Sequence, residues 1–244
     1  MAQQSEILPL GGDALLLRFS TAFSEPANRA ALAFRAAFLK DGTKGVTESA
    51  TSLTSCLIRF DPTQTSRDTV KEAMLGTLAT QDWSDAALPE GRTLWRIPAA
   101  FGGEYGPQLS ETAELADRSP EEAVKEICAT RLRVLAIGFA PGQPYLGFLD
   151  DNWDIPRQTQ VTPQVPPGAV VVAVRQVIPF SNAAPTGWRQ IGRTAFRCYD
   201  RDAIDPIPLR PGDEVQFQEI TAGDLTSLLK TPQPNGGALR EDIS

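Results

Sequence analysis

The chain has 244 residues, of which 41% are hydrophobic and 22% charged, as is typical of a soluble globular protein with one large domain or two small ones. Its net charge is -7 at pH 7 and it has no basic cluster, which argues against nucleic acid as a partner. Because the sequence contains no histidine, a Ser-His-Asp triad, a histidine general base and a histidine-ligated metal are excluded within this chain.

The sequence also disfavours membrane, disulfide and metal-binding classes. No segment approaches the roughly 20 consecutive apolar residues that span a bilayer, and the polar N-terminus lacks a signal-peptide core. We therefore expect a cytoplasmic protein with no membrane partner. Cys56, Cys128 and Cys198 are far apart and have apolar neighbours, so we expect buried free thiols rather than disulfides or metal ligands, and no metal site.

Residues 1–90 predict a small α+β domain. Its first helix has Ser24 as a candidate N-cap and carries Ala, Leu and Phe at helical spacing. A polar connector follows the second helix. The expected elements are strand, turn and strand over residues 7–20, a helix over 25–39, strands over 45–48 and 55–60, and a helix over 66–80.

Residues 91–244 predict a closed or nearly closed β-barrel, because short strands are linked by turns rich in proline and glycine. A helix start at Ser119 is favoured by the proline and the acids that follow it. The tail over residues 231–244 is polar and is expected to fray. The expected strands cover residues 94–98, 132–137, 169–174, 188–194, 195–199 and 214–219, and helices cover 110–116 and the segment from 119 onward.

A stretch rich in glycine and proline follows the apolar strand over residues 132–137. Prolines fix the backbone and remove donors, whereas glycines allow positive φ and a close approach of backbone to another group. Phe139 and Tyr145 are set into this stretch. The result is a stiff, shaped and partly apolar loop, which either packs a corner of the fold or lines a pocket.

Several motifs together resemble one protein family. They are Gly138-Phe139-Ala140-Pro141-Gly142-Gln143, Phe101-Gly102-Gly103-Glu104-Tyr105-Gly106-Pro107, Val165-Pro166-Pro167-Gly168, Pro185-Thr186-Gly187-Trp188, Ile191-Gly192-Arg193-Thr194 and Pro211-Gly212-Asp213. In this order and spacing they resemble the family of the 5-oxoprolinase B subunit, also called allophanate hydrolase subunit 1 or the KipI-type sensor-kinase inhibitors. The resemblance runs over nearly the whole chain.

The resemblance implies both a fold and a working context. The implied fold is a small α+β domain followed by a cyclophilin-like β-barrel domain. The implied partner is a homologous second subunit, of the 5-oxoprolinase C-subunit or allophanate hydrolase subunit 2 type, together with a third subunit in 5-oxoproline opening. ATP would be used by the complex and no cofactor bound by this chain alone, since Gly102-Gly103 lacks the lysine and Ser/Thr of a nucleotide-binding loop.

The sequence leaves three functions open. The first is a non-autonomous subunit of a 5-oxoprolinase-like hydrolase that opens a small amide or lactam. The second is a KipI-type inhibitor of a sensor histidine kinase, which is a regulatory binding protein. The third is a carboxyltransferase subunit related to allophanate hydrolase and urea carboxylase, which requires a biotinylated partner.

Some positions depart from the pattern of the family. Gln143 stands where the loop usually has a second phenylalanine, and Gln158, Thr162 and Gln164 stand where arginines are usual. Loss of arginine removes bidentate recognition of a carboxylate or phosphate, which glutamine does not replace. Arg157 is the cation that this segment retains.

The catalytic candidates are an arginine, a tyrosine and a glutamate. Arg157 is expected to hold a carboxylate or carbonyl group of the substrate, with a surface arginine after a turn as the alternative. Tyr145 would offer its hydroxyl to a substrate carbonyl, with a core wedge as the alternative. Glu104 is the best carboxylate for acid–base work, and its alternative is a solvated loop acid.

A second group of residues is expected to bind substrate. The loop would shape a pocket at the mouth of the barrel, next to Arg157 and the strand that carries Gln176, and a sister polypeptide would complete it. The alternatives are a polar strand end for Gln176 and an outward direction for Arg193, while Trp188 is expected to plug the barrel. The substrate-binding candidates are Gly138, Phe139, Pro141, Gly142, Gln176 and Arg193.

Overall fold

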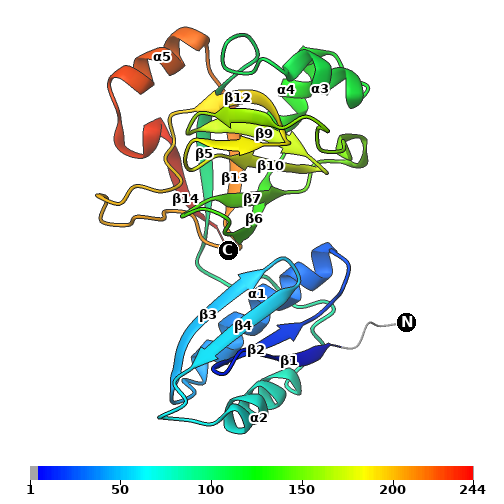
Figure 1. Cartoon of the computed structure of the whole chain (residues 1–244), viewed down its shortest axis with the longest axis vertical. Helices are drawn as coiled ribbons and strands as arrows, with labels where there is room; N and C mark the ends of the chain where they lie inside the picture. The colour runs from blue at the N-terminus through cyan, green and yellow to red at the C-terminus, as the bar shows by residue number, and fades with distance from the viewer. Residues whose placement is uncertain (1–4, 244) are drawn as a thin grey trace. The chain divides into compact units, whose positions relative to one another are not determined.

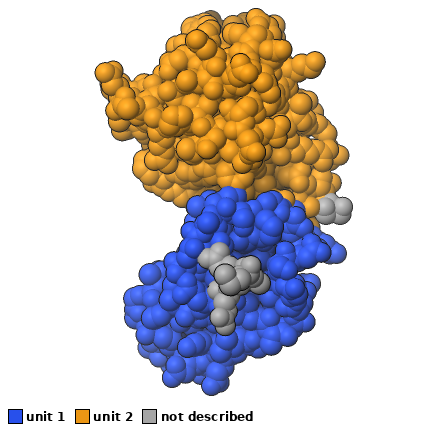
Figure 2. Space-filling model, turned by 90° about the vertical axis from the view of Figure 1, so that its right-hand side faces the viewer, with its two compact units in different colours: residues 1–90, 244 blue, residues 91–243 orange. Residues whose placement is uncertain are grey.

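The protein folds into two compact units, each with its own hydrophobic core. The computed structural model describes residues 5–243. These residues divide into one unit up to residue 90 and a second from residue 91 onward, which Figure 2 colours separately. Across residues 5–243, every helix is too short or too polar to cross a bilayer.

The first unit is a sheet with two helices, as predicted (Figure 1). Its elements are β1 (Glu6–Leu10), β2 (Ala14–Arg18), α1 (Glu25–Lys40), β3 (Val46–Ser52), β4 (Ser55–Phe60) and α2 (Arg67–Leu78). The strands lie in the order β1-β2-β4-β3, each antiparallel to its neighbour. Helix α1 packs against β3 and β4 and buries Phe34 and Phe38 in the core of this unit.

Both helices of the first unit begin at a serine that caps them. The Ser24 hydroxyl accepts a hydrogen bond from the Ala27 backbone N–H at 3.4 Å, and the Ser66 hydroxyl accepts one from Thr69 at 3.1 Å. Each bond satisfies one backbone donor that the helix itself leaves without a partner. The predicted Ser24 cap is confirmed.

The second unit is the barrel domain (Figure 1). Its elements are β5 (Arg92–Phe101), α3 (Leu109–Leu115), α4 (Pro120–Ala129), β6 (Leu132–Ile137), β7 (Pro144–Gly147), η1 (Asp151–Trp153), β8 (Thr162–Val165), β9 (Ala169–Ala173), β10 (Gln176–Pro179), β11 (Ala184–Thr186), β12 (Arg189–Thr194), β13 (Glu214–Glu219), α5 (Ala222–Lys230), η2 (Pro234–Gly237) and β14 (Leu239–Ile243). Among these described strands, seven follow the order β6-β13-β5-β12-β9-β10-β7. Pairing of β6 with β7 closes the ring, so the predicted barrel is confirmed.

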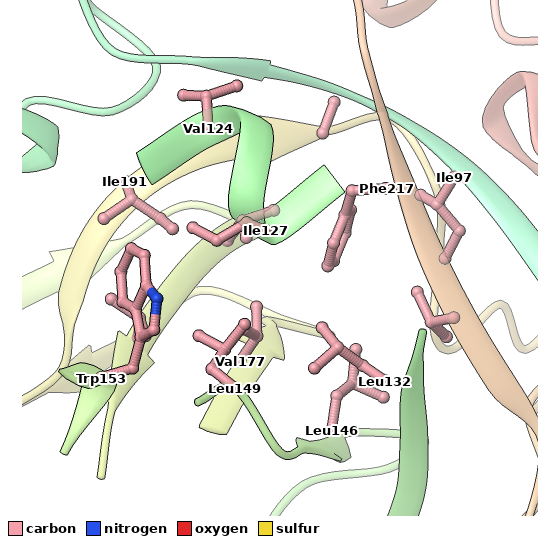
Figure 3. Packing of buried hydrophobic residues seen from close by; sticks show 14 of the residues in the cluster. Ile97, Val124, Ile127, Leu132, Leu146, Leu149, Trp153, Val177, Ile191 and Phe217 are labelled. Carbon is pink, nitrogen blue, oxygen red and sulfur yellow. The ribbon is translucent and has the colours of Figure 1, made fainter. Parts of the chain in front are cut away.

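The interior of the barrel is filled by its own side chains (Figure 3). Leu132, Leu146, Val177 and Phe217 from four strands meet there with exposed fractions of at most 1%. Helix α4 adds Val124 and Ile127 to the same cluster. Close packing of this kind leaves no lumen, so a ligand site on this unit has to lie outside the barrel interior.

The outer face of the wall around β9 and β10 carries a second apolar cluster. Side chains alternate along a strand, so Val170 and Val172 join the interior core while Val171 and Ala173 join the outer cluster. The antiparallel ribbon of β8 and β11 contributes to it as well. The buried members of this outer cluster are Val165, Ala169, Val171, Ala173, Ile178, Phe180 and Trp188, with Tyr145 and Ala184 packed against them.

The expectation that Trp188 plugs the barrel is wrong. Its side chain is buried in the outer cluster, because its ring packs edge-on against Tyr145, 6.5 Å between centroids, on the outside of the wall. The expected strand over residues 195–199 is also wrong. There the backbone N–H of Phe196 donates to the Thr194 hydroxyl instead of to a neighbouring strand.

The C-terminal tail is more ordered than its composition suggests. Strand β5 pairs with β12 only over Ala99–Phe101, which leaves the edge of its first half open on that side. Strand β14 fills that edge by pairing antiparallel with residues 92–96, so the expected fraying is wrong for residues 239–243. Residue 244 lies outside the described residues. Helix α5, which the sequence patterns do not predict, begins at a capping box of Thr221 and Asp224.

The cysteines are free thiols, as predicted. Cys56 and Cys198 are buried and Cys128 is half-buried. Burial raises the pKa of Cys56 and of Cys198 to about 12, and that of Cys128 to about 11. All three are therefore neutral at physiological pH and poor nucleophiles.

Candidate functional site

A cavity of about 200 Å³ lies on the outer face of the barrel wall, and we call it the outer cavity. Its floor is the outer cluster, and its rim comes from the loop between β6 and β7, the segment before β8, and β11 with the turn that follows it. Its volume is below the roughly 300–1,000 Å³ of pockets that take drug-sized ligands, so it suits a smaller molecule. The lining residues are Phe139, Gln143, Tyr145, Arg157, Ile178, Phe180, Pro185, Thr186, Gly187 and Trp188.

The loop between β6 and β7 is held by its own backbone. Gly138 N–H donates to the Gln143 carbonyl at 3.0 Å, and Gln143 N–H donates to the Ala140 carbonyl at 3.1 Å. Gly142 has a φ of 69°, and a Cβ there would lie 2.2 Å from the Cys198 carbonyl oxygen. Only glycine fits this contact, which presses the loop against the segment after β12. The loop is thus a rigid support for the residues that flank it.

Phe139 stands at the rim in an unusual conformation. Its φ is 70°, a left-handed value that costs a residue with a side chain roughly 1–2 kcal/mol. The ring gains little from burial in this chain, since it is 78% exposed. A strained backbone that presents a large exposed aromatic ring beside a cavity is typical of a surface that another molecule covers.

Gln143 lies in the wall of the outer cavity and is 2% exposed. Its side-chain Oε1 is buried and has no hydrogen-bond partner among the described residues. An unmet buried acceptor costs about 1–3 kcal/mol, so native proteins rarely keep one without a reason.

The positive charge of the site comes from Arg157. Its guanidinium carbon lies 5.4 Å from the centroid of the Trp188 ring, within reach of a cation–π interaction. Arg157 has no acidic partner among residues 5–243. Stacking on an aromatic face orders the guanidinium without using its N–H donors, so these stay available for a carboxylate.

A glutamine network fixes the wall behind Arg157. Gln158 N–H donates to the Gly187 carbonyl at 2.6 Å, and its Nε2 donates to the Trp188 carbonyl at 3.0 Å. Gln108 Nε2 in turn donates to Gln158 Oε1 at 2.6 Å. Gln158 therefore ties two segments of the wall together.

The predicted site residues fall into two groups. Phe139, Tyr145 and Arg157 are brought together around the outer cavity. The other predicted residues do not line it: Glu104 is exposed in the loop after β5, Gly138, Pro141 and Gly142 shape the loop from behind, Gln176 is half-buried two residues before Ile178 on β10, and Arg193 donates to the Pro167 carbonyl at 3.2 Å.

The most informative side chain of the site is one that sequence reasoning missed. Gln143 stands out in the sequence only as a departure from the family loop, although a polar residue at an aromatic position of a rigid loop is a signal in itself. Thr186 and Trp188 belong to the motif Pro185-Thr186-Gly187-Trp188, but only the fold shows that this motif forms a wall of the cavity.

A larger cavity, about 550 Å³, lies elsewhere in the barrel unit among residues 195–208, α5 and η2, and we call it the α5 cavity. Its charged groups already have partners: Arg197 pairs with Asp200 at 3.1 Å, and Asp205 with Arg210 at 2.7 Å. No unpartnered buried side-chain atom found in residues 5–243 belongs to its lining. We place the site at the outer cavity, although its volume is smaller, because among the described residues Arg157 lacks an acidic partner and Gln143 Oε1 lacks a hydrogen-bond partner.

The chemistry available in the outer cavity is binding and polarisation. Arg157 can hold a carboxylate, and the Tyr145 hydroxyl can donate to a carbonyl. The described lining contains no Asp, Glu or Lys, so it offers neither a carboxylate nor an amine as a general base. Nor do residues 5–243 contain a group of His, Cys, Asp and Glu arranged to hold a metal ion.

Comparison with known proteins places the chain. Residues 5–209 match the family described as "Carboxyltransferase domain, subdomain C and D". The chain belongs to this family. Three curated relatives, each named as the B subunit of 5-oxoprolinase, agree with the motif resemblance, which is thereby confirmed.

Two curated relatives and one solved structure show how far the likeness extends. The Bacillus subtilis 5-oxoprolinase B subunit is 29% identical over 236 residues, covering 92% of this chain and 96% of that protein. Its Escherichia coli O157:H7 namesake is 37% identical over 134 residues, covering 55% of this chain and 61% of that protein. The crystal structure of TTHA0988 has a TM-score of 0.71 at 31% identity, covering 86% of this chain and 40% of that one.

Proposed function

We propose that this chain is the B subunit of a heteromeric, ATP-dependent hydrolase that opens 5-oxoproline, and that the outer cavity binds this lactam. A homologous second subunit and a third subunit would complete the enzyme in the cytoplasm. ATP would bind outside this chain. Family membership and the shared name of the curated relatives support the proposal.

The observation that carries the proposal is the state of Arg157. A cation without an acidic partner among the described residues stands over an indole ring at the rim of a small aromatic cavity. 5-Oxoproline is compact, and it carries one carboxylate and one cyclic amide. The carboxylate matches the guanidinium in charge and geometry, and the ring matches the apolar floor of Ile178 and Phe180.

The cavity also supports separate roles for the subunits, with substrate binding in this chain and the attacking groups in another. Without a carboxylate or an amine as a general base in its described lining, this chain would bind and orient the lactam while another subunit supplies the groups that attack it. Tyr145 would polarise the ring carbonyl. Phe139, exposed at the rim, would be covered by the docking subunit. Glu104 is a candidate acid only if that partner completes a site around its loop.

Reconstitution tests this function. The chain would be coexpressed with the products of neighbouring reading frames, purified as a complex, and assayed for glutamate formed from 5-oxoproline with and without ATP. The proposal predicts ATP-dependent turnover by the complex and none by the single chain. Turnover by the single chain, or copurification with a histidine kinase in place of a homologous subunit, would contradict it.

The family description supports a second candidate, a carboxyltransferase role. In that case a biotinylated protein would copurify with the chain, and avidin would deplete the complex. The outer cavity would then hold the group that receives the carboxyl. A complex that opens 5-oxoproline in the presence of excess avidin would exclude this alternative.

A further inference from the structure

Gln143, in the wall of the outer cavity, carries a buried acceptor that the protein leaves unmet. Among the described residues Gln143 Oε1 is buried and unpartnered, whereas the backbone N–H and carbonyl of the same residue are both hydrogen-bonded within the loop. The backbone thus holds the side chain at the cavity wall. Buried polar side-chain atoms nearly always have a partner, so this acceptor indicates a ligand that brings the missing donor.

We propose that the Gln143 carboxamide recognises the amide edge of the lactam and sets the specificity of the cavity for it. Oε1 would accept the ring N–H while Nε2 donates to the ring carbonyl. A small lactam is locked in the cis form, so its N–H and carbonyl face the same side and match a primary amide through two antiparallel hydrogen bonds. This inference rests on the proposed function, because it assumes that the lactam occupies the outer cavity.

The geometry of a glutamine allows this contact. The last torsion of its side chain is broad and roughly two-fold, so a small rotation turns Oε1 and Nε2 toward a ligand. The other polar lining groups then take the rest of the molecule, with Arg157 on the carboxylate and Tyr145 near the carbonyl.

A water molecule fits Oε1 less well than a lactam does. Buried waters make about three hydrogen bonds to polar neighbours. The apolar part of the lining consists of Ile178, Phe180 and Trp188, which offer carbon surface and few groups that could bind a water. A flat lactam ring covers that surface and presents its donor in the same molecule.

The consequence is discrimination between lactam and lactone. The lactone analogue of 5-oxoproline replaces the ring N–H by an oxygen, which brings a second acceptor against Oε1. Loss of one hydrogen bond and burial of two facing acceptors should weaken binding roughly tenfold to a hundredfold. The ring shape and the carboxylate are unchanged, so any difference reports on the N–H.

The test is calorimetric titration of the full chain with 5-oxoproline and with the lactone, in wild type, Gln143→Leu and Gln143→Glu. Wild type should favour the lactam, and Gln143→Leu should bind both ligands with similar, weaker affinity. Gln143→Glu should keep the lactam preference at lower affinity, because it retains an acceptor but adds a charge near the ligand carboxylate. Gln160→Leu, a solvent-exposed glutamine outside the cavity lining, is the matched control and should behave as wild type.

Side-chain amide signals in a nitrogen–proton NMR spectrum add a readout that a merely structural role would not move. The pair of signals missing from Gln143→Leu identifies Gln143, and the shift of this pair should reach half its full size at a roughly tenfold to hundredfold lower concentration of the lactam than of the lactone. Equal affinity for both ligands, no binding of either, or a preference that survives in Gln143→Leu would overturn the inference. The proposed function fails separately, through absence of ATP-dependent turnover by the complex.

Discussion

The outer cavity and the α5 cavity belong to the same unit but differ in what their polar groups already do. In the larger α5 cavity, Arg197 and Asp205 are both paired with neighbours of opposite charge. In the smaller outer cavity, Arg157 has no acidic partner and Gln143 Oε1 has no hydrogen-bond partner among the described residues. A hollow whose groups satisfy one another needs no ligand to complete it. The contrast shows why polar groups without partners indicate a ligand site better than the volume of a cavity does.

The largest expected effect comes from the loop that holds Gln143 in place. Gly142→Ala places a Cβ 2.2 Å from the Cys198 carbonyl oxygen at a φ of 69°. The left-handed backbone costs roughly 1–2 kcal/mol and the clash adds to it, so we expect a loss of more than about 3 kcal/mol in unfolding free energy. Gly103→Ala is the matched control, since it has positive φ but nothing within 4 Å of the added Cβ. Urea unfolding that ranks the two variants equally would contradict the close contact.

The next largest effect is expected on the affinity for 5-oxoproline when the arginine of each cavity is replaced. Arg157→Gln should weaken binding of 5-oxoproline roughly tenfold to 150-fold, the value of a hydrogen bond to a charged group. Arg197→Gln removes the paired cation of the α5 cavity and should leave the affinity unchanged. Titration calorimetry measures the affinity of both variants for 5-oxoproline. A larger loss in Arg197→Gln would move the site to the α5 cavity.

The free energy of unfolding should distinguish a buried glutamine that lacks a hydrogen-bond partner from one that has a partner. Gln190 is buried like Gln143, but its Nε2 donates to the Tyr105 carbonyl at 2.8 Å. Gln190→Met leaves that carbonyl without its donor and should cost about 1–3 kcal/mol, whereas Gln143→Met removes an acceptor that had no partner and should leave the unfolding free energy unchanged or raise it. Urea unfolding measures both. Equal destabilisation would show that Gln143 already has a partner that stabilises the fold.

The smallest effect concerns Cys198, whose backbone contacts the loop at Gly142. Burial raises the pKa of its thiol to about 12 from an ordinary value of 9.0, so the unfolded chain loses this proton before the folded chain does. The thiol's contribution to stability is therefore complete below pH 9 and is lost as the pH rises toward 12, by up to about 1.4 kcal/mol per pH unit. Cys198→Ala should flatten the fall in unfolding free energy between about pH 8 and 10. An unchanged slope would mean that the thiol is accessible.

Local chemistry made much of the fold predictable. The Ser24 and Ser119 caps correspond to helix starts in the structure, and all but one of the predicted strands correspond to observed strands. The sequence patterns do not predict strand β14, because its partner is the open edge of β5, far away in the sequence. The polar composition of β14 does not indicate that pairing. The strand expected over residues 195–199 failed because the Thr194 hydroxyl takes a backbone donor.

The candidate site was less predictable for a related reason. Phe139, Tyr145 and Arg157 are identified from the loop and from the retained arginine, and the fold brings them together. The role of Gln143 depends on its neighbours in space, and none of the described residues donates a hydrogen bond to its Oε1. A single sequence does not show which residues those neighbours are. Trp188 lies in the outer cluster, and its contact with Arg157 is visible only in three dimensions.

The most direct test of the account is a crystal structure of the assembled complex with 5-oxoproline bound. We predict the ligand in the outer cavity, with its carboxylate on the Arg157 guanidinium and its ring amide paired with the Gln143 carboxamide. A ligand in the α5 cavity, or one held entirely by another subunit, would contradict the account.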